Sequence, residues 1–199
     1  YSILGTLGEG GFGRVFAARR NINQVVAVKV THKWKHYRKG QGDRASLLRE
    51  RDCMALAALN NVPFWAKLLA SWEDAHNVYF VMVSDERRRS RPLSGSPEYL
   101  RRSQVLAVSY LEKHEIIHSD IKPENFLVTS REDHLVLTDF GVADRRPSAS
   151  DVPFDEWYLG GRAGTTTYMS PETLLLEETY HRSDIYSLGL VFLQVFLGW

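Results

Sequence analysis

One stretch of the chain restricts its possible folds more than any other: the run 118–125, His-Ser-Asp-Ile-Lys-Pro-Glu-Asn, followed further on by Asp139-Phe140-Gly141. Two apolar runs, Phe126-Leu127-Val128 and Leu135-Val136-Leu137, lie between these polar groups, and a polar turn from Ser130 to Asp133 separates the runs. This pattern predicts a β-hairpin. The hairpin would display polar residues at the ends of strands, where a rigid scaffold commonly carries chemistry.

The polar residues of this stretch suit phosphoryl transfer, a reaction that depends mainly on positioning and charge neutralisation. Asp120 can orient a hydroxyl group and accept its proton, and Lys122 can face the migrating phosphoryl group. Asn125 and Asp139 offer oxygen ligands of the kind that Mg²⁺ prefers. The alternative is a polar loop between two buried elements, with Asp139-Phe140-Gly141 an ordinary turn.

These residues resemble the catalytic loop and the metal-binding triplet of eukaryotic protein kinases. One position departs from the pattern, because the family usually has arginine where this chain has Ser119. The other motifs of the chain follow in the order that the resemblance implies.

A glycine-rich segment near the N-terminus, Gly8-Glu9-Gly10-Gly11-Phe12-Gly13-Arg14-Val15, matches the pattern G-x-G-x-x-G-x-V. Glycines allow a backbone to turn tightly and approach phosphates closely. Dinucleotide-binding folds share this pattern, but there the loop opens into a helix. Here strand-like residues follow, 15–18 and 25–30, so the order strand–loop–strand resembles the phosphate lid of kinases.

Two residues are expected to form the ion pair that places the nucleotide. Ala27-Val28-Lys29 resembles the V-A-I-K strand of kinases, which implies that Lys29 contacts the α- and β-phosphates. Asp43 can cap a helix from Arg44 to Leu59, and Glu50 lies on its apolar face with Leu47, Met54 and Ala58, at spacings of three and four. A carboxylate on a buried face needs a partner, and Lys29 is the candidate. The rival carboxylate, Asp52, lies off that face.

The resemblance also predicts the nucleotide pocket. Asn77 to Val83 reads as a buried strand, after which the backbone of Val83 and Asp85 would bind adenine beside Met82. Leu7, Val15, Ala27 and Leu127 would enclose the ring. The full predicted nucleotide site is Leu7, Gly8, Glu9, Gly10, Gly11, Phe12, Gly13, Val15, Ala27, Lys29, Met82, Val83, Asp85 and Leu127.

The C-terminal half continues the same order. A helix from Pro97 to Lys113 leads to the catalytic loop, and a long polar segment, 142–162, resembles an activation segment. It ends in the run 164–172, Gly-Thr-Thr-Thr-Tyr-Met-Ser-Pro-Glu, which is similar to G-T-x-x-Y-x-A-P-E with serine replacing alanine. In serine/threonine kinases the threonine at position Thr165 reaches the catalytic aspartate and lysine. Asp184 opens a buried helix and would brace the catalytic loop.

Three positions bear on regulation. Many kinases hold a phosphorylated activation segment with an arginine before the catalytic aspartate and a second cation after the metal triplet. Here these positions carry Ser119 and Asp144, and the usual phosphorylated threonine falls at or near Gly161. We therefore expect activity without phosphorylation of the activation segment.

Composition describes an ordinary globular chain of 199 residues, 44% hydrophobic and 25% charged. The net charge of +1 gives no case for nucleic acid, and no stretch is long and apolar enough to span a bilayer. Cys53 is the single cysteine, reads as a core residue, and excludes an internal disulfide. No signal peptide is evident. We expect an intracellular protein, cytoplasmic or nuclear.

The expected fold is the two-lobed α+β kinase fold: an N-lobe, 1–83, with a small antiparallel sheet and a helix, and a mainly helical C-lobe, 84–199. The expected activity is transfer of the γ-phosphoryl group of ATP, with Mg²⁺, to a serine or threonine of a protein. The pattern P-F-x-x-K-L-x-x-S-x-x-D at 63–74 resembles the AGC group.

Two rival functions remain: a nucleotide-binding pseudokinase or scaffold without turnover, and a small-molecule phosphotransferase of similar fold. The family continues through further helices after Trp199, so we expect those helices, or a partner, to be needed for stability.

Overall fold

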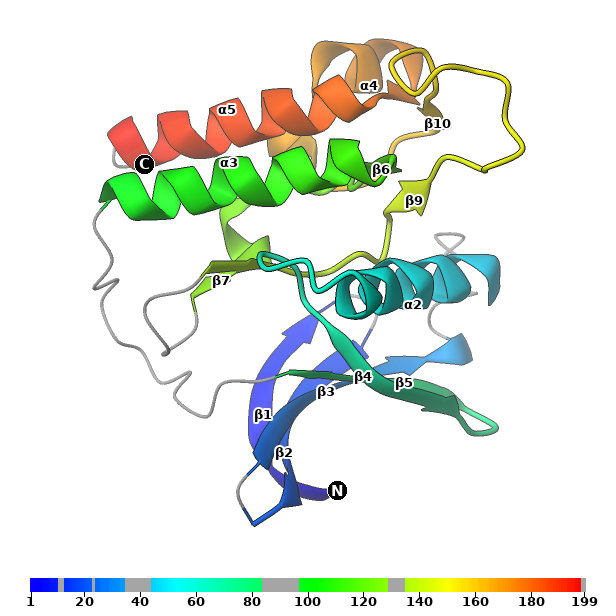
Figure 1. Cartoon of the computed structure of the whole chain (residues 1–199), viewed down its shortest axis with the longest axis vertical. Helices are drawn as coiled ribbons and strands as arrows, with labels where there is room; N and C mark the ends of the chain where they lie inside the picture. The colour runs from blue at the N-terminus through cyan, green and yellow to red at the C-terminus, as the bar shows by residue number, and fades with distance from the viewer. Residues whose placement is uncertain (11–12, 23, 35–43, 84–96, 129–134, 198–199) are drawn as a thin grey trace.

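The computed structural model describes residues 1–10, 13–22, 24–34, 44–83, 97–128 and 135–197. Its N-terminal half is one antiparallel sheet with the strand order β1-β2-β3-β5-β4. The strands are β1 (Ser2–Gly10), β2 (Gly13–Asn21), β3 (Gln24–His32), β4 (Leu68–Glu73) and β5 (Asn77–Val83). Figure 1 shows helix α2 (Arg44–Leu59) beside this sheet, with the remaining helices on the far side of α2.

The C-terminal half is mainly helical. It contains α3 (Pro97–Lys113), α4 (Pro171–Leu176) and α5 (His181–Leu197), and α3 and α5 lie side by side (Figure 1). Short pieces connect them: β6 (Ile116–Ile117), η1 (Pro123–Asn125), β7 (Phe126–Val128), β8 (Leu135–Leu137), β9 (Asp144–Arg145), β10 (Leu159–Gly160), η2 (Thr166–Tyr168) and β11 (Glu178–Thr179). The predicted two-lobed α+β architecture is therefore confirmed. The lobe boundary at residue 84 adjoins residues outside the described ranges and stays a prediction.

The predicted hairpin forms, because β7 pairs antiparallel with β8. Two further pairings join parts of the chain that are distant in sequence: β6 pairs with β9, and β10 pairs with β11. The first pairing places the segment that follows Asp139-Phe140-Gly141 against the strand that precedes the catalytic loop. The predicted turn of the hairpin, Ser130 to Asp133, lies outside the described residues.

Helix α2 has the predicted bounds, and its buried face is apolar except for two polar residues. Leu47, Cys53, Met54 and Ala57 are buried on it, whereas Ala58, which the spacing assigns to this face, is exposed. Near the C-terminal end of the helix the buried face therefore includes Ala57 in place of Ala58, because an α-helix has about 3.6 residues per turn. Burial raises the pKa of the Cys53 thiol to about 12, which suits a core residue and not a nucleophile.

One hydrophobic core joins the two halves. It includes Met54 of α2, Phe80 of β5, Leu111 of α3 and Phe140, all buried. Trp65 lies between them, donating its indole N–H to the Ala107 carbonyl at 2.9 Å and contacting the Phe140 ring edge-on. This core fixes the sheet, α2 and α3 around the segment that carries Asp139.

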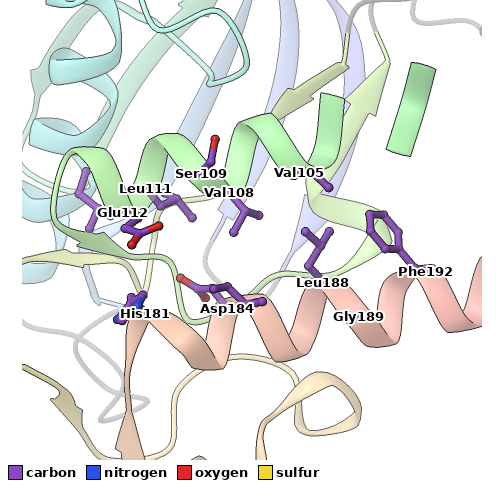
Figure 2. Close-up of a pocket in the computed structure, with 12 residues that line it drawn as sticks. Val105, Val108, Ser109, Leu111, Glu112, His181, Asp184, Leu188, Gly189 and Phe192 are labelled. Carbon is purple, nitrogen blue, oxygen red and sulfur yellow. The ribbon is translucent and has the colours of Figure 1, made fainter. Parts of the chain in front are cut away.

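Between α3 and α5 runs a groove of about 340 Å³, lined mainly by apolar side chains such as Val105, Val108, Leu188 and Phe192 (Figure 2). Across the part of the chain that the structure describes, every helix is too short or too polar to cross a bilayer.

Candidate active site

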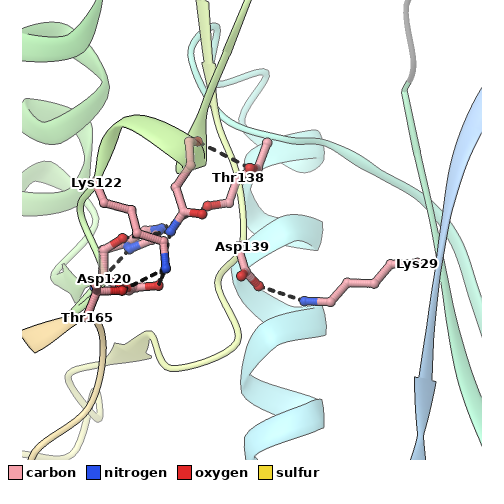
Figure 3. Close-up of polar contacts among 8 residues, drawn as sticks. Lys29, Asp120, Lys122, Thr138, Asp139 and Thr165 are labelled. Atoms are coloured by element: carbon pink, nitrogen blue, oxygen red, sulfur yellow. Dashed lines mark hydrogen bonds and ion pairs between the residues drawn. The ribbon is translucent and has the colours of Figure 1, made fainter. Parts of the chain in front are cut away.

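The centre of the site is a triangle of hydrogen bonds around Asp120 (Figure 3). Lys122 Nζ donates to Asp120 Oδ2 at 2.7 Å and to Thr165 Oγ1 at 2.8 Å. The Thr165 hydroxyl donates to Asp120 Oδ1 at 2.7 Å. The structure thus brings together two residues of the catalytic loop and one from the far end of the activation segment. Charge-assisted bonds of this length fix the orientation of the carboxylate.

Asn125 supports the same carboxylate from the side of the hairpin. Its amide nitrogen donates to the Asp120 backbone carbonyl at 2.7 Å and to Asp120 Oδ2 at 3.2 Å. The Thr138 backbone N–H in turn donates to the Asn125 carbonyl at 2.9 Å. Because the amide nitrogen is committed to Asp120, the amide oxygen is the atom that Asn125 offers to a metal ion.

Helix α5 holds the backbone of the catalytic loop through the carboxylate of Asp184. Asp184 Oδ2 accepts the His118 N–H at 2.6 Å, and Asp184 Oδ1 accepts the Ser119 N–H at 2.9 Å. Ser119 has a φ of +65°, a left-handed conformation that non-glycine residues rarely adopt and that persists only where the surroundings impose it. Burial raises the pKa of Asp184 to about 7, although the two N–H groups oppose the shift.

Gly164 is required where the activation segment returns to the catalytic loop. Its φ is +97°, and a Cβ atom there would lie 2.1 Å from the Ser119 carbonyl oxygen and 3.3 Å from Asp120 Oδ1. No larger residue fits without moving the catalytic loop. The glycine therefore permits the close approach that places Thr165 on Asp120.

A second cluster joins the sheet, α2 and the segment after β8. Lys29 Nζ of β3 donates to Glu50 Oε1 at 2.5 Å and to Asp139 Oδ1 at 2.7 Å. Burial alone would lower the pKa of Lys29, but the two carboxylates outweigh burial and raise the pKa above its ordinary value. Burial raises the pKa of Glu50, and the Lys29 ammonium opposes that shift. The rival, Asp52, is exposed and pairs with Arg51.

Asp139 fits a hard cation such as Mg²⁺. The Lys29 ammonium holds the pKa of its carboxyl at about 2, so the group is ionised at neutral pH. Its φ of +63° turns the side chain toward Lys29, and Gly141 leaves room beside it, because a Cβ there would lie 3.3 Å from Asp139 Oδ1. The donor set, a carboxylate and the Asn125 amide oxygen, has the chemistry that Mg²⁺ requires.

Four of the residues predicted to line the nucleotide pocket share one face of the sheet. Val15 pairs with Lys29, and Ala27 pairs with Met82, so these side chains share a face. In the glycine hairpin Gly8 pairs with Val15, Glu9 with Arg14 and Gly10 with Gly13. Leu7 lies at a register shift in β1, Leu127 lies in β7, and Val83 ends β5, where its side chain is exposed. Gly11, Phe12 and Asp85 lie outside the described residues.

Sequence reasoning missed two ion pairs that tie down the activation segment. Arg49 Nε lies 3.1 Å from Asp144 Oδ2. The Arg146 guanidinium binds Glu115 Oε1 at 2.5 Å and the Ser150 carbonyl at 2.8 Å. Neither pair has a local signal, because the partners are far apart in sequence.

The structure also explains one departure from the family pattern, at Ser170. Its buried side chain caps α4 by accepting the Thr173 N–H at 3.4 Å, a position that favours serine over alanine.

Comparison with known proteins agrees with this geometry. The family described as "Protein kinase domain" matches residues 1–199, and the chain belongs to this family. The chain is 29% identical to serine/threonine-protein kinase SCH9 of Candida albicans, over 100% of this chain and 25% of that protein. It is 30% identical to the cAMP-dependent protein kinase catalytic subunit of Schizosaccharomyces pombe, over 100% of this chain and 38% of that protein.

A third relative is serine/threonine-protein kinase sgk-1 of Caenorhabditis elegans, 29% identical over 100% of this chain and 42% of that protein. The chain therefore spans less than half the length of these relatives.

Proposed function

We propose that the protein transfers the γ-phosphoryl group of Mg²⁺-ATP to a serine or threonine hydroxyl of a protein substrate. One observation carries the proposal: Asp120, Lys122 and Thr165 form a closed set of hydrogen bonds that joins the catalytic loop to the end of the activation segment. Phosphoryl transfer requires a fixed carboxylate beside a cation, and this arrangement supplies both.

In the proposed reaction Asp120 orients the attacking hydroxyl and accepts its proton. Lys122, already 2.7 Å from Asp120 Oδ2, faces the transferred phosphoryl group and offsets its charge. Thr165 holds the second oxygen of Asp120, which leaves the carboxylate a single orientation. Asp184 positions these groups through the backbone of His118 and Ser119.

The nucleotide would bind at the face of the sheet that carries Lys29. Lys29 would contact the α- and β-phosphates while Glu50 holds its ammonium group in place. Asn125 and Asp139 would hold the metal ion, which when bound neutralises charge on the phosphates. Val15, Ala27 and Met82 present apolar surface on the same side and would contact adenine, together with Leu7, Leu127 and the backbone of Val83.

The substrate class rests on Lys122 and Thr165. Lys122 contacts Asp120 and Thr165, and Thr165 contacts Asp120, which is the arrangement that the resemblance to serine/threonine kinases implies. Two of the relatives named above, SCH9 and sgk-1, are serine/threonine-protein kinases. A cytoplasmic or nuclear location is part of this proposal and rests on the single, buried cysteine.

Purified full-length protein with γ-labelled ATP and a peptide library tests the proposal. We expect label on serine or threonine peptides. Asp120→Asn and Asp139→Asn should each lower kcat by about 10²-fold or more, because each removes a positioned charge from the transition state. Asp151→Asn, an exposed carboxylate of the activation segment, is the matched control and should keep the parent rate.

Circular dichroism and thermal melting establish that both variants fold. Folded Asp139→Asn protein with the parent rate would contradict the assignment. Nucleotide binding without transfer by the parent would instead support the pseudokinase reading.

A further inference from the structure

Two segments of the molecule meet at Lys29, and the same two segments meet a second time at an ion pair. Arg49 precedes Glu50 on α2, and its Nε lies 3.1 Å from Oδ2 of Asp144 in β9. Asp144 follows Asp139 by a few residues, so the helix that supplies Glu50 and the segment that supplies Asp139 are joined at a second point besides Lys29. Figure 1 shows α2 and β9 next to each other.

Asp144 is a firm attachment point because its backbone is fixed independently. β9 pairs with β6, with Ile117 opposite Asp144 and Ile116 opposite Arg145. Arg145 Nε also donates to the His114 carbonyl at 3.2 Å. Because β6 leads directly into the catalytic loop, an arginine that grips Asp144 connects α2 to the loop that carries Asp120.

The ion pair borders a cavity of about 380 Å³ between α2, the catalytic loop and the activation segment. Arg49 is the one basic side chain that lines this cavity among the described residues, and Asp144 neutralises it. The other polar side chains of the lining are hydroxyls, including Ser119, whose Oγ is buried and meets no hydrogen-bond partner within the described ranges. A phosphate placed here would meet a carboxylate and a cation that is already paired.

We propose that Arg49 and Asp144 are a positioning pair for phosphoryl transfer, which fixes α2 to β9 without any phosphate and thereby keeps Glu50 and Asp139 on Lys29. This inference rests on the proposed kinase function. It assigns to an internal ion pair the role of linking α2 to the activation segment. The cavity beside the pair then needs no ligand for activity.

The expected effect is moderate, because the side chains of Arg49 and Asp144 are 42% and 31% exposed and solvent weakens such a pair. Arg49→Gln and Asp144→Asn should each lower kcat by about two- to fivefold and leave the KM for peptide unchanged. Asp144→Arg should lower kcat more than either of these substitutions, because it places two guanidinium groups next to each other. The exchanged protein, Arg49→Glu with Asp144→Arg, should return to within about twofold of the parent.

Arg51→Gln is the matched control. Arg51 lies on the same helix and is also 42% exposed, but it pairs with Asp52 next to it and does not reach β9. All proteins are full-length and treated with phosphatase, and mass spectrometry confirms that the activation segment is unmodified. The parent should keep its rate after this treatment.

A second measurement is the rise in Tm caused by Mg²⁺-ADP, which requires no turnover. The rise should be smaller in both neutralised variants and restored in the exchanged protein. Single variants with the parent kcat and the parent Tm rise would overturn the positioning pair and leave the kinase proposal intact. An exchanged protein with a kcat and a Tm rise no higher than those of Asp144→Arg would also overturn the positioning pair.

Two further outcomes would be decisive. A large loss of parent activity after phosphatase treatment, mapped to Ser148, Ser150 or Thr165 to Thr167, would also overturn the positioning pair. A parent that shows the Tm rise but no transfer would overturn the kinase proposal, and the pair would then be judged by the Tm rise alone.

Discussion

At the residue scale, a tight steric constraint beside the catalytic carboxylate belongs to Gly164. A methyl group at this position would lie 2.1 Å from the Ser119 carbonyl oxygen, and the φ of +97° is itself unfavourable for alanine. Something must move, and the neighbours are the backbone of the catalytic loop and the Asp120 carboxylate. The catalytic geometry therefore depends on the absence of a side chain as much as on the charged groups.

We predict that Gly164→Ala lowers kcat by about 10-fold or more, because it pushes the backbone of Ser119 and separates Thr165 from Asp120. Gly160→Ala is the matched control, since nothing lies within 4 Å of its Cβ position. Steady-state kinetics and thermal melting of both variants check this. Equal rates for the two alanine variants would show that the loop adapts without cost.

Single residues also show how far the sequence could be read. Lys29 and Glu50 stand out because a charged residue in a strand or on an apolar helix face requires a partner. Asp120 and Asp139 stand out because they belong to motifs that resemble the catalytic loop and the metal-binding triplet. The partner of Asp144 could not be found in this way, because Arg49 lies on a different element and both side chains are partly exposed. An ion pair between residues that are distant in the sequence produces no periodic pattern from which it could be predicted.

At the element scale, elements with an apolar pattern were predictable, down to the three-residue strands of the β7–β8 hairpin, and two-residue strands were not. α2 has the predicted bounds because some of its apolar residues recur at spacings of three and four, and β5 is the predicted strand because it is a nearly continuous apolar run. β9 and β10 are two residues long each, which is too short for any pattern, and only tertiary pairing creates them. The predicted role of Ala58 on the buried face failed by one residue for the related reason that helix periodicity drifts near an end.

Helix α5 contributes one element-scale prediction through Asp184. Burial raises the pKa of this carboxyl from about 3.8 to about 7, so the folded protein holds a proton that the unfolded chain releases. Stability from this group is therefore present at low pH and is lost as pH rises toward 7. Over the whole range between the two pKa values the loss is on the order of 4 kcal/mol.

Urea unfolding of the parent and of Asp184→Asn between pH 5 and pH 9 measures this effect. The free energy of unfolding of the parent, relative to the variant, should fall up to about pH 7 and then level off. A difference that stays constant across this range, or that grows with pH, would show that the two N–H groups outweigh burial and keep Asp184 ionised.

At the scale of the whole molecule, the exposed face of α5 predicts how residues 1–199 behave when they are expressed alone. Leu193 is 51% exposed on α5 and follows Phe192, which lines the apolar groove against α3. An exposed apolar side chain next to an apolar groove favours association between chains. We expect concentration-dependent self-association in sedimentation velocity, and Leu193→Gln should reduce it.

Leu59→Gln is the control for that experiment, because Leu59 is 88% exposed but lies at the end of α2, away from the groove. It should leave association unchanged. A chain that stays monomeric at every concentration and melts in one sharp transition would contradict the expectation.

The double connection between α2 and the segment after β8 also has a consequence for how the protein tolerates mutation. The Lys29 contacts and the Arg49–Asp144 pair work in parallel, so either one can hold the helix when the other is weakened. Substitutions in the two links should then not have additive effects on activity. The loss of activity in a protein with both links weakened should exceed the sum of the losses caused by weakening each link alone. In such a chain the history of one position decides which changes are acceptable at the other.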